Sequence, residues 1–110
     1  MDETYTVKIT TPAQTQLQDI FRYIAEELQE PVTASRFLAL MEQEILSLSL
    51  FPHRIALTEE EPWRKKGIHK MTVKSYLVYF WIDEPHKKVQ VTAIVYGRRN
   101  QRQVLSEMKL

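Results

Sequence analysis

The stretch YLVYFWI at residues 76–82, followed by DEPHKK at 83–88 and VQVTAIVY at 89–96, decides the fold. The first segment is apolar or aromatic at every position, which is typical of a strand buried on both faces of a sheet. The second segment places Pro85 among charged residues and predicts a turn. The third is rich in β-branched residues and favours a strand. Together they predict a hairpin whose first strand lies centrally in the sheet.

Two further segments are expected to join this hairpin. Residues 68–73 predict a strand that precedes it directly in the chain. Residues 4–10 alternate and are rich in β-branched side chains, with Tyr5, Val7 and Ile9 on one face. A short strand is unstable on its own, so this first strand is expected to pair with the later ones.

A first helix is predicted at residues 12–29. Thr11 can cap it, Pro12 suits its first position, and Gln14 completes a capping box. Apolar residues then follow at helical spacing.

A second helix is predicted at residues 31–50, opened by Pro31. Pro52 ends it, because the residue before a proline avoids helical backbone. The link between the two helices is short, so they are expected to form an antiparallel hairpin. Residues 51–66 are expected to form a loop.

The predicted fold is therefore α+β, with the order β-α-α-β-β-β in a single domain over residues 1–110. The N-terminal helical hairpin is expected on one face of a small, mainly antiparallel four-stranded sheet. The other face is expected to be partly open, with Tyr96 and Arg98 projecting from it. Residues 100–110 are expected to form a short helix or no regular structure.

Composition excludes several classes of protein. The chain has 110 residues, no cysteine and two glycines, which excludes disulfides, thiolate metal sites and glycine-rich phosphate loops. No apolar run reaches the ~18–20 residues of a membrane span. The acidic start of the chain has the wrong sign for a signal peptide. A cytoplasmic protein without a membrane partner is expected.

The net charge of +1 conceals a strong asymmetry. Residues 1–61 carry 4 Lys and Arg against 11 Asp and Glu, a balance of −7, and residues 62–110 carry 11 against 3, a balance of +8. A basic half of this size indicates an anionic partner, either nucleic acid or an acidic protein segment. The alternative is a charge-balanced fold whose halves attract each other.

The basic residues fall into three groups near aromatic side chains, and arginine beside an aromatic ring can grip a phosphate backbone or an acidic peptide. The alternative is that the aromatic residues are core and the lysines are solvated. The candidate target-binding or nucleic-acid-binding residues are Arg64, Lys65, Lys66, Lys70, Lys74, Arg98, Arg99 and Arg102.

The three histidines, His53, His69 and His86, are not spaced to share a metal ion, and no metal or other cofactor is expected. His69 lies among basic residues and is a candidate proton carrier. No motif places a serine, a histidine and a carboxylate together, so a catalytic triad is not predicted.

In this order of elements, several motifs resemble the RelE/ParE superfamily of bacterial toxins from type II toxin–antitoxin modules. The start of the first helix at Thr11-Pro12-Ala13 is similar to that family. So are the strand and turn Tyr79-Phe80-Trp81-Ile82-Asp83 and the closing strand with its basic end, 91–100. The resemblance covers about residues 4–105. It implies a toxin silenced by a cognate antitoxin, whose C-terminal segment wraps over the toxin.

Two activities share this fold, and the resemblance implies different site residues for each. RelE-like members cut mRNA on the ribosome; here Arg99 matches their catalytic arginine, and Tyr96 or His69 would move protons. Tyr76 and Leu105 stand where that branch carries an arginine and a tyrosine.

ParE-like members poison DNA gyrase instead, and the two replaced positions favour this branch. Arg98, Arg99 and the C-terminal tail would then carry the interaction, helped by Trp63 and Tyr76. A further alternative is a non-toxic remnant that only binds its antitoxin.

Overall fold

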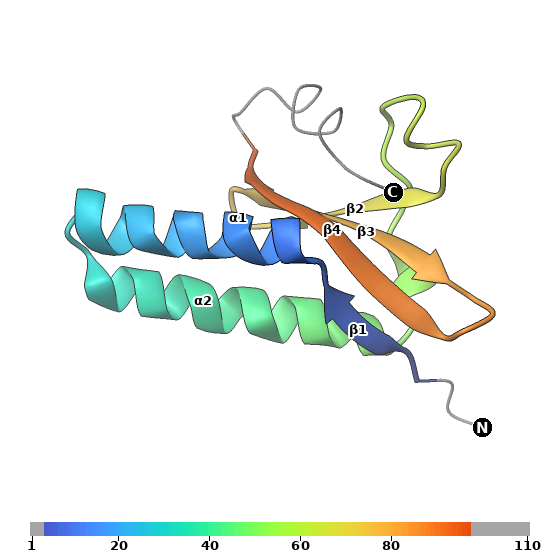
Figure 1. The fold of residues 1–110 in the computed structure, drawn as a ribbon, viewed down its shortest axis with the longest axis horizontal. Helices are drawn as coiled ribbons and strands as arrows, with labels where there is room; N and C mark the ends of the chain where they lie inside the picture. Colours follow the sequence, from blue (N-terminus) through green and yellow to red (C-terminus); the bar gives the residue numbers. More distant parts are fainter. Residues whose placement is uncertain (1–3, 98–110) are drawn as a thin grey trace.

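The structure is a computed structural model that describes residues 4–97. Its helices and strands follow the predicted order β-α-α-β-β-β, with two helices beside a single sheet (Figure 1). The main elements are β1 (Thr6–Ile9), α1 (Thr11–Arg22), α2 (Pro31–Leu46), β2 (Ile68–Val73), β3 (Tyr76–Asp83) and β4 (Lys88–Tyr96).

The sheet has the strand order β1-β4-β3-β2. β1 runs parallel to β4, and the other two pairs are antiparallel, which confirms a mainly antiparallel sheet with β3 inside it. The register between β3 and β4 shifts between Tyr79 and Phe80, where Thr92 donates its hydroxyl to the Tyr79 carbonyl. A bulge of this kind bends the strand and increases its twist.

The first helix is shorter than the sequence predicts, and a different residue caps it. Thr10, one residue earlier than expected, accepts a hydrogen bond from the Ala13 amide, and the Gln14 side chain donates to the Ile9 carbonyl. The regular helix ends at Arg22 and continues as a wider π-helical turn, η1 (Tyr23–Glu27). The helical segment therefore stops at residue 27 instead of 29.

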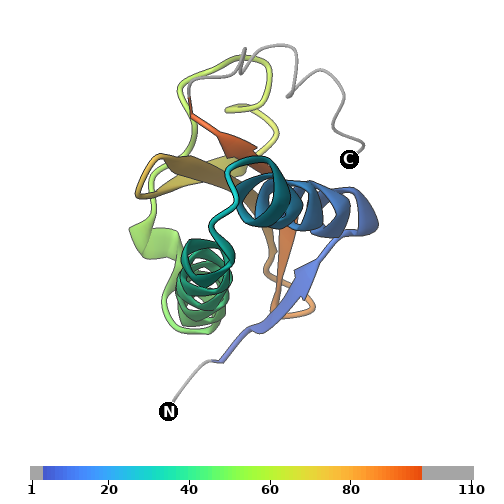
Figure 2. The same ribbon diagram turned by 90° about the vertical axis from the view of Figure 1, so that its left-hand side faces the viewer.

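The second helix begins at Pro31 as predicted and ends at Leu46, followed by a short 3-10 turn, η2 (Ser47–Ser49). A further 3-10 turn, η3 (Pro52–Arg54), lies within the predicted loop. Figure 2, which looks along the helices, shows α1 and α2 side by side on one side of the sheet. This confirms the helical hairpin.

Most of the core lies between the hairpin and the sheet, where Phe37, Met41, Val78 and Phe80 are buried. The opposite face of the sheet is predicted to be partly open, and Trp81, which pairs with Ile68 on this face, is 36% exposed. A second, smaller core forms there around Ile68, Leu77, Tyr79, Ala93 and Val95, and Trp63 from the preceding loop packs against it. The loop covers part of this face because an exposed patch of large apolar side chains is costly in water.

The turn between β3 and β4 is tied to two distant segments by one carboxylate. Glu84 accepts a hydrogen bond from the Tyr5 hydroxyl at 2.6 Å. It also forms an ion pair with Lys87 at 2.9 Å. The Nε2 atom of His53 in η3 also contacts Glu84. These contacts lower the pKa of Glu84 to about 2, the Tyr5 bond being the largest cause. We call this set of four residues the Glu84 cluster.

Candidate functional site

An apolar groove lies between the first helix and the last two strands. Its volume is about 660 Å³. One wall comes from α1 and η1, and the other from the start of β3 and the end of β4. The lining residues are Gln16, Asp19, Ile20, Tyr23, Ile24, Leu28, Tyr76, Ile94, Val95 and Tyr96. We call this surface the tyrosine groove.

Aromatic rings form one end of the tyrosine groove. The rings of Tyr76 and Tyr96 lie 5.6 Å apart, and Phe37 packs against Tyr76 at 4.7 Å. Burial raises the pKa of Tyr76, so its phenol stays protonated and is a hydrogen-bond donor at neutral pH. Tyr96 therefore lies on the helix-covered side of the sheet. The expectation that it projects from the opposite face is wrong, because it pairs with Tyr76 on the same side.

Two exposed residues on the helical wall widen the apolar surface. Tyr23 is 55% exposed and Leu28 is 47% exposed. Leu28 continues the helical spacing of apolar residues in the first helix, but the π-helical turn changes the angle between successive residues and leaves Leu28 exposed. Nothing in the periodicity signals Tyr23 as a site residue. Both are available to a partner.

One predicted cation, Lys74, lies beside the groove. It occupies the turn between β2 and β3 and lines a smaller hollow together with Tyr76 and Phe37. The Gly97 amide donates to the Ser75 carbonyl in the same turn, so the end of β4 is held beside Lys74. The predicted residues Arg98, Arg99 and Arg102 follow in the chain and lie outside the described residues.

The basic residues in β2 and in the loop before it do not gather with Lys74. Lys70 pairs with Glu60 at 3.3 Å, and Lys66 lies over the Trp63 ring at 5.1 Å. Arg64 donates to the Thr58 carbonyl at 3.4 Å. Their cationic groups are thus engaged with the loop before β2. Lys74 follows the last residue of β2 and therefore lies at the opposite end of this strand from that loop.

Acidic residues of the same loop lie against this basic group. Glu60 holds Lys70, and the Glu61 carboxylate accepts the backbone amide of Lys65. The positive charge of this segment is therefore partly neutralised within the chain. This weakens it as a phosphate-binding surface.

His69 is separated from Tyr96. Its ring stacks on Phe80 at 5.0 Å, and its Nδ1 atom bonds the Ile55 carbonyl at 2.7 Å. Burial lowers its pKa. His69 pairs with Phe80 and Tyr96 pairs with Tyr76, four residues along β3, or roughly 13 Å of strand. The two candidate proton carriers therefore do not share a site.

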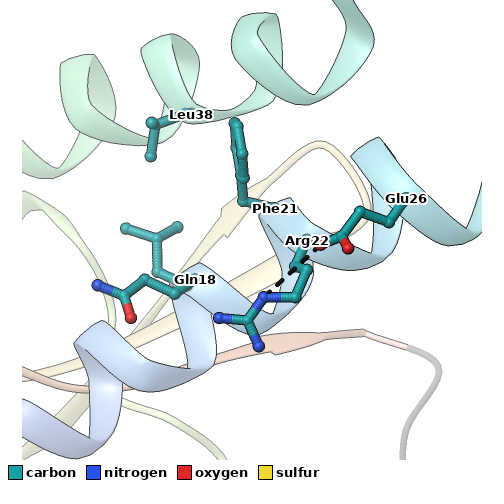
Figure 3. Close-up of a pocket in the computed structure, with 6 residues that line it drawn as sticks. Gln18, Phe21, Arg22, Glu26 and Leu38 are labelled. Atoms are coloured by element: carbon teal, nitrogen blue, oxygen red, sulfur yellow. Dashed lines mark ion pairs between the residues drawn. The ribbon is translucent and has the colours of Figure 1, made fainter. Parts of the chain in front are cut away.

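A second hollow of about 310 Å³ lies along the helical hairpin, where Phe21 of α1 points toward Leu38 of α2 (Figure 3). Its rim charges are paired: Arg22 lies 3.8 Å from both Asp19 and Glu26. It is smaller than the tyrosine groove and contains no aromatic cluster. The tyrosine groove is therefore the better candidate site.

Other classes of site find no support in the part of the chain that the structure describes. Within residues 4–97, no three histidine, aspartate or glutamate side chains gather as a metal site would require. Over the same residues, no helix has the length and apolar character needed to span a membrane.

These features define the protein as a small α+β domain with a preformed apolar groove beside its last strand, the kind of surface that binds a protein segment. Residues 7–101 match the sequence profile of the ParE toxin of the type II toxin–antitoxin system parDE. The chain belongs to this family of toxins, within the RelE/ParE superfamily that the sequence motifs indicated. No curated relative shows significant sequence similarity.

Three toxin structures are among the solved structures that share the fold. The chromosomal ParDE system of Pseudomonas aeruginosa matches with a TM-score of 0.70 at 18% identity, over 86% of this chain and 97% of that chain. The RelBE2 toxin–antitoxin complex of Mycobacterium tuberculosis matches with a TM-score of 0.61 at 21% identity, over 87% and 97%. A free mutant RelE toxin of Escherichia coli matches with a TM-score of 0.60 at 15% identity, over 94% and 93%.

Proposed function

We propose that this toxin is ParE-like: it stops bacterial growth by binding and poisoning DNA gyrase in the cytoplasm, and a cognate antitoxin holds it inactive. One observation carries the proposal. The site that is assembled is an apolar groove, whereas His69 and Lys70, two groups that a nuclease could use, lie apart from it. An apolar groove suits protein recognition, and nucleolytic chemistry needs its proton carriers within hydrogen-bond reach.

The tyrosine groove is where we expect the antitoxin to bind. An amphipathic segment can place apolar side chains against Ile20, Tyr23 and Leu28, while the protonated Tyr76 hydroxyl can donate to a carbonyl or carboxylate. The description of the P. aeruginosa relative as a ParDE system supports such a partner.

The gyrase contact is expected from Arg98, Arg99 and Arg102, which follow β4 directly. Arginine binds carboxylates through two parallel hydrogen bonds and is common at the centre of protein interfaces. An antitoxin in the groove would lie beside the start of this segment, since Tyr96 lines the groove. Binding there can therefore block the basic segment directly.

A RelE-like mRNA nuclease is the second candidate. Lys74, Tyr76 and Tyr96 lie at one end of the sheet, and Arg99 follows. A cation and a tyrosine beside an arginine could hold an RNA phosphate and move a proton. His69 would then play no part, because it lies at the far end of β3. A remnant that only binds antitoxin predicts no growth arrest.

The test is controlled expression of the full chain, followed by growth measurement, mRNA primer extension, and a supercoiling and cleavage assay with purified gyrase. We expect growth arrest with intact mRNA and gyrase-dependent DNA breaks. Arg98→Ala with Arg99→Ala should abolish arrest. The matched control, Lys8→Ala with Lys88→Ala, removes the same charge at the other end of the sheet and should remain toxic.

The outcomes separate the candidates. New mRNA ends within translated codons, with gyrase unaffected, would establish the nuclease instead. Full toxicity of the folded Arg98/Arg99 variant would refute the assigned contact residues. Absence of arrest by the unaltered chain at a measurable protein level would leave only antitoxin binding.

A separate binding measurement tests the groove. Tyr23→Ala with Leu28→Ala should weaken antitoxin binding by at least ~10-fold, because both side chains are exposed apolar anchors on the groove wall. Leu46→Ala is the control, since Leu46 is an apolar residue at least as exposed but lies on α2, outside the groove. An unchanged affinity of the double variant would place the antitoxin elsewhere.

A further inference from the structure

The solvent-facing side of α2 carries apolar residues at a spacing of seven. Val32 and Leu46 are 63% and 64% exposed, and Ala39 lies midway between them and is also exposed. Seven residues are close to two helical turns, so these three side chains form one line along the helix. Figure 1 shows this helix along the lower left of the molecule, with β1 near its C-terminal end. The buried side of α2 is the opposite one, formed by Ala34, Phe37, Met41 and Ile45.

The polar residues beside this line are arranged symmetrically about Ala39. Arg36 lies three residues before Ala39 and Glu42 three residues after it; Ser35 and Gln43 lie four residues to either side. All four are exposed. A surface with this arrangement complements itself when it is turned by 180°, which is the requirement for a two-fold symmetric contact between identical chains.

We propose that α2 forms an antiparallel contact with α2 of a second copy of this chain, centred on Ala39. The small side chains of the two Ala39 residues let the helices approach closely at the symmetry axis. Val32 then packs against Leu46 of the other copy at both ends. Each Arg36 lies at the level of the other copy's Glu42, which its long side chain can reach, and the opposed helix dipoles add a small attraction.

The charge pattern favours a second copy over an unrelated helix. Because the arginine lies in the first half of α2 and the glutamate in the second half, the same sequence supplies both members of each ion pair. Within the described residues, neither Arg36 nor Glu42 has an ion pair in its own chain. The contact therefore brings two charges together without breaking an existing pair.

The contact is small, which limits its strength. α2 has 16 residues and is about 24 Å long at 1.5 Å per residue. One pair of such helices buries less than the ~1,200 Å² typical of stable complexes, so we expect a weak dimer that forms below roughly 1 mM. No residue of the tyrosine groove belongs to α2. The dimer and the antitoxin site are therefore separate, and this inference stands apart from the proposed function.

The absence of cysteine from the sequence gives a sharp test by disulfide trapping in the full chain. Ala39→Cys should form a linked dimer under mild oxidation, because this position meets its own copy at the axis. Val32→Cys and Leu46→Cys should each stay unlinked alone but link when mixed, since the two positions are about 21 Å apart on one helix. Thr33→Cys, exposed but turned about 100° around the helix, is the control.

A charge exchange supplies a second measurement by sedimentation. Arg36→Glu or Glu42→Arg should each weaken the dimer about 10-fold, and the two together should restore it. Both side chains are exposed, so we expect folded variants, checked by circular dichroism. Tyr23→Ala with Leu28→Ala should leave the dimer unchanged, which separates this inference from the antitoxin site.

Three results would overturn the proposal. The first is that the unaltered chain stays monomeric up to roughly 1 mM. At that concentration, a dimer with a binding free energy of only about −4 kcal/mol would already be half formed. The mixed Val32→Cys and Leu46→Cys chains could link no faster than either alone. The double charge exchange could fail to recover the dimer. Trapping of Ala39→Cys and of the mixed pair, with recovery by the double exchange, would establish the antiparallel contact.

Discussion

At the β3–β4 turn, the carboxylate of Glu84 joins three segments of the chain through Tyr5, His53 and Lys87. At the opposite end of β3, Tyr76 lies beside Tyr96 at the edge of an apolar groove. The first end satisfies its polar groups within the chain, whereas the second leaves apolar surface uncovered by the described residues. One end of the sheet is thus fastened, and the other is available to a partner.

The difference has a physical basis in the residues that each end carries. A carboxylate with three donors orients the segments that supply them, because charge-assisted hydrogen bonds are directional. Aromatic rings have broad apolar faces, and any partner that removes these faces from water is bound more favourably. We therefore expect changes at the Glu84 end to affect folding, and changes at the groove end to affect binding.

The largest expected effect compares two aromatic residues on the same strand. Phe80 is fully buried, so Phe80→Ala should lower the free energy of unfolding by about 3–5 kcal/mol. Tyr76 is only partly buried, at the groove, and Tyr76→Ala should cost about 1–2 kcal/mol. Urea unfolding of both variants measures the difference. Equal losses would contradict the division between a fastened and an available end.

Much of the fold follows from the sequence, because local patterns agree with the tertiary structure. The uninterrupted apolar run of β3 places it inside the sheet, and Pro31 places the start of α2. Two features depend on contacts distant in sequence. The π-helical turn after Arg22 leaves no mark in the apolar periodicity, and Trp63 covers the second face of the sheet from a loop.

The site was harder to predict because side-chain direction depends on register. His69 and the basic residues are near each other in sequence, but β2 spreads them along its length. Tyr96 was predicted as a candidate residue but assigned to the wrong face, since the bulge beside Tyr79 shifts the alternation of β4. The His53–Glu84 contact joins residues 31 positions apart, and no sequence motif indicates it.

A smaller effect is expected from Glu84→Gln and has a defined pH range. The folded-state pKa of Glu84 is lowered to about 2, so its stabilisation is complete above the ordinary pKa of 4.5 and is lost as the pH falls toward 2. The variant should be less stable than the unaltered chain at pH 7, and the difference should shrink between pH 4.5 and pH 2. Urea midpoints across this range measure it.

Glu27→Gln is the matched control, because Glu27 is an exposed carboxylate on the helical hairpin. Its stability should follow that of the unaltered chain throughout. If Glu84→Gln did the same, the Glu84 cluster would not fasten this end of the sheet. Tyr5→Phe should remove the largest cause of the pKa shift and raise the pKa of Glu84.

The smallest expected effect belongs to His69, whose ring lies 6.3 Å from that of His53 in the Glu84 cluster. Burial lowers its folded-state pKa below 6.5, so the unfolded chain binds a proton at a pH where the folded chain does not. The contribution of neutral His69 to the free energy of unfolding is therefore complete above about pH 6.5, and it declines as the pH falls below this value. His69→Phe keeps a ring against Phe80 and removes this titration, although it also loses the bond to the Ile55 carbonyl. The variant should lose less stability between pH 7 and pH 5 than the unaltered chain. An equal loss would assign the decline to another group.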